Sequence, residues 1–112
     1  MIIKNISKGT VLSDSCKRAD SFFVRFVGLM GKKELEPGSG LILTPCNSIH
    51  MFFMRFPIDA VFIDSNNKVV YLMENLEPWR ISPVIRKAHS VIELLPGTIS
   101  SSGTELGDTL AV

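Results

Sequence analysis

The amino-acid sequence predicts a mainly β domain, a β-rich α+β fold built as a compact antiparallel sandwich, jelly roll or barrel with one N-terminal amphipathic helix. Short apolar runs rich in Val, Ile, Leu and Phe recur along the chain, and turn residues separate them. A single stretch near the N-terminus has apolar residues at helical spacing. With 112 residues, the chain is expected to form one domain over residues 1–112.

Composition narrows the class of protein. Apolar residues make up 46% of the chain and charged residues 21%, which favours a folded globular domain over a disordered one. The formal charge of +1 argues against a general nucleic-acid binder, because such proteins carry an excess of basic residues. Apolar runs are shorter than a signal peptide or a membrane span requires. We therefore expect a soluble, cytoplasmic protein, a monomer or weak homodimer, that needs no cofactor.

The first third of the chain is expected to form two strands and then the helix. Residues Met1–Ile6 and Gly9–Leu12 are typical of short strands joined by a turn. Between Ala19 and Met30, apolar residues recur every three or four positions, which predicts one face of an amphipathic helix. Residues suited to capping the two ends of that helix are Ser13, Asp14 or Ser15, and Gly28 or Gly31.

The middle of the chain predicts the centre of the sheet. A strand is expected at Leu41–Thr44. Residues Ile58–Ile63 are apolar on both faces except at Asp59, as in a central strand. A turn at Asp64–Asn67 then leads into Lys68–Met73, the second arm of a hairpin.

The last third is expected to alternate irregular chain with short strands. Leu76–Lys87 contains two prolines and several charged residues, which favours an irregular excursion. Ser90–Leu95 predicts another strand, which Pro96–Gly97 ends. Short strands are also expected at Thr98–Ser100 and Thr109–Val112, and they complete the sandwich or barrel.

Several fragments, in one order along the chain, resemble a known family. They are Arg25-x-x-Gly28-Leu29-Met30, Gly40–Leu43, Pro45–His50, Phe53-Met54, Pro57–Asp59 and Glu93–Gly97. The ordered set extends from about Thr10 to Leu110 and is similar to the domain of unknown function 192 family. The resemblance implies a small, mainly β domain of sandwich or jelly-roll type, and it implies no activity.

Residues 46–64 hold the densest group of polar side chains inside an apolar run, a density that ordinary core strands do not need. Strand alternation places Asp59 where both faces are buried. Its carboxylate must therefore find donors, raise its pKa or line a wet cavity. The expected partners are Arg25, Arg55 and His50. The structural alternative is a carboxylate that pins a turn or the Arg25 end of the helix.

Spacing disfavours both metal binding and thiol catalysis. On an extended segment, Cys46 and His50 lie roughly 13 Å apart, too far for one zinc ion to bridge. Across a bend, Cys46, His50 and Asp59 would supply a thiol–imidazole–carboxylate set, and His89 could replace His50 from another strand. We predict no metal site, and we expect Cys16 and Cys46 to carry free thiols.

Aromatic residues could form the wall of a site. If Phe52 and Met54 face the core, then Phe53 and Arg55 face outward unless a second layer covers them. Trp79, in the irregular excursion, could fold over that outer face. Many small polar ligands are held by an aromatic surface with polar side chains beside it. The alternative is that these residues fill the core, with Trp79 closing one end of the sandwich.

We favour a non-enzymatic binding module for a small polar or carbohydrate-like ligand. The residues expected to contact this ligand are Asn47, His50, Phe53, Arg55, Asp59 and Trp79. The first alternative is an enzyme, a hydrolase or lyase that uses His50 with Asp59 or Cys46. The second is a protein-interaction domain that uses the basic face of the helix or an exposed strand edge.

Overall fold

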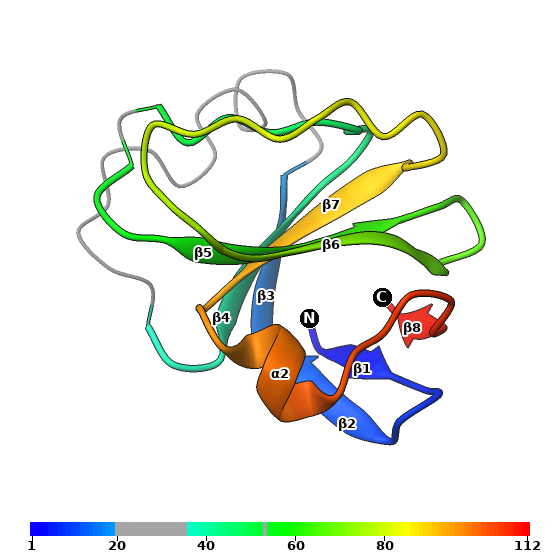
Figure 1. The fold of residues 1–112 in the computed structure, drawn as a ribbon. Coiled ribbons are helices and arrows are strands. Elements are labelled where there is room, and N and C mark those ends of the chain that lie inside the picture. The colour runs from blue at the N-terminus through cyan, green and yellow to red at the C-terminus, as the bar shows by residue number, and fades with distance from the viewer. Residues whose placement is uncertain (20–35, 53) are drawn as a thin grey trace.

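The computed structural model describes residues 1–19, 36–52 and 54–112, and these residues form two β-sheets and one short helix (Figure 1). The predicted mainly β architecture is therefore confirmed. The elements are β1 (Ile3–Asn5), β2 (Thr10–Ser13), β3 (Ser15–Ala19), β4 (Ser39–Leu43), β5 (Ile58–Ile63), β6 (Val69–Leu76), β7 (Ser90–Leu94), α2 (Thr98–Ser102) and β8 (Leu110–Ala111).

The smaller sheet has the strand order β2-β1-β8 and joins the two ends of the chain. β1 pairs antiparallel with β2 and with β8. The turn between β1 and β2 contains Gly9 at a φ of 69°, and its N–H donates to the Asn5 carbonyl at 2.8 Å. The predicted first pair of strands is thus confirmed.

The larger sheet has the strand order β3-β4-β7-β5-β6. β5 lies between β7 and β6, so the predicted interior strand and its hairpin partner are confirmed. One pair differs from the antiparallel expectation, because β3 runs parallel to β4. Residues 20–38 separate these two strands, and that stretch is long enough for the crossover that a parallel pair requires.

The predicted N-terminal helix falls mostly outside the described residues. Where the prediction can be compared, it is wrong. Ser13 ends β2, Ser15 begins β3 and Ala19 ends β3, so residues expected to cap or begin a helix belong to strands. The parallel pairing of β3 with β4 fixes this segment as extended chain, and local helical spacing does not reveal such a distant partner.

The helix that the structure describes lies near the C-terminus, where short strands were expected. α2 replaces the predicted strand at Thr98–Ser100. Gly97 at φ 91° and Gly103 at φ 70° bracket the helix in left-handed conformations, which glycine adopts without steric cost. The Gly103 N–H closes the last turn by donating to the Ser100 carbonyl at 3.2 Å.

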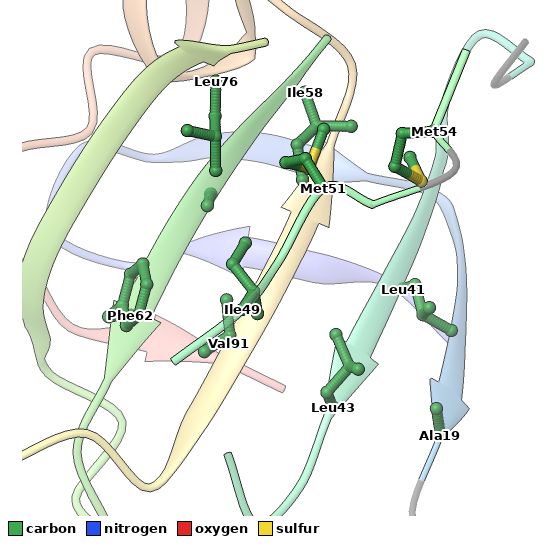
Figure 2. Packing of buried hydrophobic residues seen from close by; sticks show 11 residues of the cluster. Ala19, Leu41, Leu43, Ile49, Met51, Met54, Ile58, Phe62, Leu76 and Val91 are labelled. Atoms are coloured by element: carbon green, nitrogen blue, oxygen red, sulfur yellow. The ribbon is translucent and has the colours of Figure 1, made fainter. Parts of the chain in front are cut away.

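Apolar side chains cover both faces of the larger sheet. In β5, Ile58, Ala60 and Phe62 face one way, while Val61 and Ile63 face the smaller sheet, and all five are buried. The first group belongs to a set that we call the outer cluster (Figure 2). Its members are Ala19, Leu41, Leu43, Ile49, Met51, Met54, Ile58, Ala60, Phe62, Leu76 and Val91.

Two irregular segments, residues 47–52 and 79–85, cross the outer cluster as an antiparallel pair that we call the outer ribbon. The Met51 N–H donates to the Arg80 carbonyl at 2.7 Å, and the Ser82 N–H donates to the Ile49 carbonyl at 2.8 Å. Ile49 and Met51 are buried beside residues of β5 and β7 (Figure 2). The irregular excursion predicted for residues 76–87 therefore packs on the sheet. Within the described ranges, no helix has the length and apolar character needed to span a membrane.

A polar cluster ties the chain ends together beside the smaller sheet. Asp108 Oδ2 accepts hydrogen bonds from Asn5 Nδ2 and from the Glu105 N–H, both at 2.9 Å. Lys8 Nζ donates to Asp108 Oδ1 at 2.9 Å. The hydrogen bond from the Asn5 side chain, and then the one from Lys8, lower the pKa of Asp108 to about 2.

We expect the stability of Asp108→Asn to depend less on pH in the acid range than the stability of the wild type. A lowered folded pKa contributes stability above the ordinary value of 3.8, and this contribution is lost as the pH falls through about 2. Thermal unfolding followed by circular dichroism from about pH 2 to about pH 7 measures the effect. Glu105→Gln, at an exposed partner of Lys8, is the control and should keep the acid loss of stability. An unchanged acid profile in Asp108→Asn would contradict this assignment.

Candidate functional site

Asp59, the carboxylate inside β5, is fixed by two backbone donors. Its side chain is fully buried. Oδ1 accepts the Asn75 N–H and Oδ2 accepts the Ile99 N–H, each at 2.9 Å. These donors are not the side chains that were expected as partners. Asp59 thus braces the backbone of β6 and of the helix α2.

A β-bulge lies opposite Asp59. Ile58 pairs with Leu76 and Ala60 pairs with Met73, so one residue of β5 faces two residues of β6. These two residues are Glu74 and Asn75, and both are exposed. Asn75 has a φ of 52°, in the left-handed region. A bulge bends its strand and redirects side chains, and bulges recur beside functional sites.

The outer ribbon presents a row of three aromatic rings. The centroids of His50 and Phe52 are 5.0 Å apart, and those of Phe52 and Trp79 are 5.9 Å apart, both with an interplanar angle of 32°. The Phe52 side chain is 41% exposed and the Trp79 side chain is 59% exposed. The predicted placement of Trp79 over the outer face is in keeping with this row. Phe52 itself faces outward rather than toward the core.

The orientation of Phe52 follows from a turn in the ribbon. Met51 and Met54 are buried, and the Met54 N–H donates to the Met51 carbonyl at 3.3 Å. This turn breaks the strict alternation on which the prediction rested, because alternate residues share one face only in extended chain. Phe52 is therefore left on the outside of the ribbon, next to the Trp79 ring.

Trp79 is held in an unfavourable backbone conformation. Its φ is 69°, a region that bulky residues rarely adopt. The Trp79 N–H donates to the Met51 carbonyl at 2.7 Å, which fixes this conformation on the ribbon. Backbone strain of this kind concentrates at functional sites. The chain thus displays a large aromatic ring at a conformational cost, and core packing does not account for it.

A hollow of about 480 Å³ lies at the end of β6, and its lining residue Arg80 follows Trp79 in the chain. It touches four consecutive residues of β6, which forms an edge of the larger sheet within the described part of the chain. Ile81, which also lines it, forms the bridge partner of His50. The lining residues are Met73, Glu74, Asn75, Leu76, Glu77, Arg80 and Ile81.

A smaller hollow of about 180 Å³ lies between the residues that begin the ribbon and those that precede β7. Cys46, Asn47 and His89 line it together with Pro45 and Ala88. The Cys46 N–H donates to the His89 carbonyl at 2.9 Å, and Cys46 Sγ donates to the Ser48 carbonyl at 3.1 Å. Cys46 therefore shares its hollow with His89, whereas His50 joins the aromatic row. Across the described part of the chain, no three His, Cys, Asp or Glu side chains gather as a metal site.

The predicted site residues are distributed over several places. His50 and Trp79 meet in the aromatic row, Asn47 lines the smaller hollow, and Asp59 is buried. Arg55 is exposed. Phe53 lies outside the described residues.

Sequence analysis missed the polar residues of the larger hollow. These are Glu74, Asn75, Glu77 and Arg80. In the sequence, an apolar run changes to charged residues before Pro78. This change is typical of the end of a strand and the start of a loop, and it does not by itself indicate a binding site.

Glu93 is a second buried carboxyl group, and sequence analysis did not single it out. In β7, it pairs with Leu41 on one side and with Ala60 on the other, so it shares their face, that of the outer cluster. The side chain is 5% exposed, and its Oε1 accepts no hydrogen bond from the described residues. Burial raises the pKa of Glu93 to about 7.

Comparison with known proteins identifies related chains. The family model DUF192, described as "Uncharacterized ACR", matches residues 3–112. A UPF0127 protein of Thermococcus sibiricus is 40% identical over 110 residues, which cover 95% of this chain and 71% of the relative. A UPF0127 protein of Pyrococcus furiosus is 38% identical over 112 residues, covering 95% of this chain and 93% of the relative.

A solved structure shares the fold. The crystal structure of a protein of unknown function from Novosphingobium aromaticivorans superposes with a TM-score of 0.84. It is 20% identical in sequence, and the match covers 99% of this chain and 82% of the other. At this level of identity, the likeness concerns the fold alone.

Proposed function

This chain belongs to the DUF192 family, whose members are described as uncharacterized, and we propose that it acts as a non-catalytic binding module. The observation that carries the proposal is Trp79, an exposed ring held in a left-handed conformation between residues that line the larger hollow. A concave site with an aromatic wall and a few convergent polar groups is the usual arrangement for binding small ligands.

The ligand that suits this site is a small polar or carbohydrate-like molecule. Glu74 and Glu77 offer carboxylate acceptors, and Arg80 offers a fork of N–H donors at the same hollow. The exposed faces of Phe52 and Trp79 can pack against the apolar side of such a ligand. Together these groups provide both the directional contacts and the flat apolar contact that a ring with hydroxyl groups requires.

The contacts favour binding over catalysis. Asp59 has both oxygens on backbone donors, and His50 Nδ1 accepts the Phe52 N–H at 3.3 Å. The Cys46 thiol donates to a carbonyl beside the smaller hollow. The three groups of the hydrolase or lyase hypothesis are thus engaged at three separate places.

A protein-interaction role is the second candidate, and the position of the hollow supports it. Within the described part of the chain, β6 pairs with β5 on one side and forms an edge of the larger sheet. An open strand edge can accept an added strand from a partner. The basic face of the predicted helix, the other surface considered for this role, falls outside the described residues.

A cytoplasmic location is part of the proposal. Cys16 and Cys46 carry free thiols, which suits a reducing compartment.

We expect at least one saccharide in a panel of glucose, N-acetylglucosamine, maltose and cellobiose to raise the unfolding temperature and change the fluorescence of Trp79. Trp79 is the single tryptophan of the chain, so its emission reports on the proposed site. Trp79→Ala should weaken binding by about tenfold or more, because it removes the aromatic wall. It should change the free energy of unfolding by less than about 1 kcal/mol, because the ring is exposed.

Val84→Ala is the matched control for this prediction. Val84 is an exposed apolar residue of the same ribbon, and it does not line the larger hollow. Its substitution should leave the affinity unchanged. If no saccharide in the panel stabilises the wild-type protein, the carbohydrate proposal fails. If Trp79→Ala binds as tightly as wild type, the site lies elsewhere.

A further inference from the structure

Asp59 joins the larger hollow to α2 through one buried carboxylate. We propose that Asp59 is a positioning residue, whose carboxylate holds the β6 bulge so that Glu74 and Asn75 line the hollow. This inference rests on the proposed binding function, and it gives Asp59 a role that needs no contact with the ligand. Full burial of Asp59 and occupation of both its oxygens by backbone donors fit this indirect role.

The register of the sheet explains why the bulge needs Asp59. A bulge leaves an extra residue outside the regular ladder of backbone hydrogen bonds. Here the extra residue is in the Glu74–Asn75 pair, opposite Asp59. Oδ1 of Asp59 accepts the Asn75 N–H at 2.9 Å, so a side chain supplies the acceptor at this break in the ladder. The backbone of Asp59 itself pairs with Leu94 on the other side of β5.

The backbone conformation of Asn75 strengthens the argument. Its φ of 52° is in the left-handed region, which costs free energy for any residue with a side chain, although asparagine tolerates it better than most. A charge-assisted hydrogen bond is about twice as strong as a neutral one and can hold such a conformation. Because Asn75 lines the hollow, its conformation sets the shape of the rim.

The second oxygen of Asp59 anchors a different part of the chain. It accepts the Ile99 N–H, which belongs to the first turn of α2. The N-cap residue of this helix is Gly97, which has no side chain to cap the helix. Asp59 therefore caps α2 from the neighbouring strand. A change at Asp59 affects both places at once, whereas a change at Asn75 affects the rim alone.

A purely structural role and a positioning role differ in a measurable way. If Asp59 only stabilises the fold, replacing Asn75 by a residue that adopts its conformation without strain should not restore ligand affinity in an Asp59 variant. If Asp59 positions the rim, a residue that adopts the left-handed conformation without help should restore affinity and leave the α2 defect in place. Glycine is that residue, because it has no Cβ.

The test compares wild type, Asp59→Ala, Asn75→Gly and the double variant at a temperature where circular dichroism shows all four folded. Alanine has no side-chain oxygen, so the Asn75 and Ile99 N–H groups both lose their acceptor. The probe is the saccharide of the panel above with the highest wild-type affinity, titrated by Trp79 fluorescence. The same four proteins are also unfolded thermally.

We expect Asp59→Ala to weaken probe binding by about tenfold in the wild-type background and by less than about threefold in the Asn75→Gly background. The fall in unfolding temperature caused by Asp59→Ala should persist in both backgrounds, because the cap on α2 is lost in both. Equal losses of affinity in the two backgrounds would overturn the proposal. Unchanged affinity in Asp59→Ala would overturn it as well.

A measurement without ligand separates this inference from the proposed function. Amide hydrogen exchange of Asn75, followed by NMR, should be faster by about tenfold or more in Asp59→Ala, because its N–H loses its acceptor. Exchange of the Leu110 amide, which donates to the Asn67 carbonyl, is the internal control and should change less than that of Asn75. If no saccharide binds wild type but Asn75 exchange accelerates, the binding function fails and Asp59 still holds the rim. If Asn75 exchange is unchanged, the positioning role fails.

Discussion

Glu93→Gln is expected to raise the free energy of unfolding by about 2–3 kcal/mol at about pH 8 and to leave it nearly unchanged at about pH 4. The Glu93 carboxyl is buried in the face of the outer cluster, and its Oε1 has no hydrogen-bond partner among the described residues. Ionisation there costs free energy, because the charge leaves water without compensation. Glutamine keeps the shape of the side chain and removes the charge.

The raised pKa of Glu93 determines whether the free energy of unfolding rises or falls with pH. Burial raises the pKa of Glu93 from an ordinary value of 4.5 to about 7 in the folded protein. Below the ordinary value the group is protonated in both states, so the folded state bears no penalty. Stability then falls as the pH rises through about 7, by at most about 3.5 kcal/mol, since one pKa unit corresponds to about 1.4 kcal/mol.

Urea unfolding at several pH values between about 4 and about 8 measures this effect. The slope of stability against pH should be smaller in Glu93→Gln than in wild type across this range. Glu36→Gln, at an exposed position, controls for the loss of one carboxylate and should keep the wild-type slope. A lower stability of Glu93→Gln at about pH 8 would show that the ionised carboxylate has a favourable partner, contrary to this assignment.

Asp59→Ala should lower the free energy of unfolding by about 2–4 kcal/mol. The substitution leaves the Asn75 and Ile99 N–H groups without their acceptor, and it removes the cap of α2. The buried Ile99 donor without a partner costs about 1–3 kcal/mol, and the partly buried Asn75 donor adds less. Chemical unfolding at about pH 7 measures the difference. An unchanged midpoint would mean that these two hydrogen bonds do not form in solution.

Asp64→Ala is the matched control for Asp59→Ala. Asp64 Oδ1 also accepts two backbone donors at 2.9 Å, from Asn66 and Lys68, in the turn that follows β5. These bonds are exposed, so water can replace the lost acceptor and the cost should be about 1 kcal/mol or less. Comparable losses in the two variants would indicate that burial of Asp59 is not the source of its effect.

The strands that were predicted correctly have strong local signals. The β5–β6 hairpin joins two apolar runs through a turn of Asp, Ser and Asn residues, and the full burial of β5 was visible in its pattern, which is apolar on both faces except at Asp59. β3 was missed because its identity depends on a parallel partner across residues 20–38. The five residues of α2 are too few for periodicity to distinguish a helix from a strand.

The candidate site was predictable only in part. Alternation correctly placed Asp59 in the interior, but its donors are 16 and 40 residues away along the chain and belong to the backbone, which no side-chain pattern reveals. Alternation does not predict the face of Phe52, because this residue lies in a turn between Met51 and Met54. Glu93 could have been noticed as a charged residue inside the apolar run of β7.

The smaller sheet places the first strand of the chain beside the last, since β1 pairs with β8 (Figure 1). Residues 110 and 111 are synthesised long after β1, so β1 must wait for its second neighbour until β8 has left the ribosome. Contacts between residues so distant in sequence also slow folding of the released chain. Closure of the smaller sheet is therefore expected among the last events of folding, and a nascent chain stopped before β8 should display β1 as an unprotected edge.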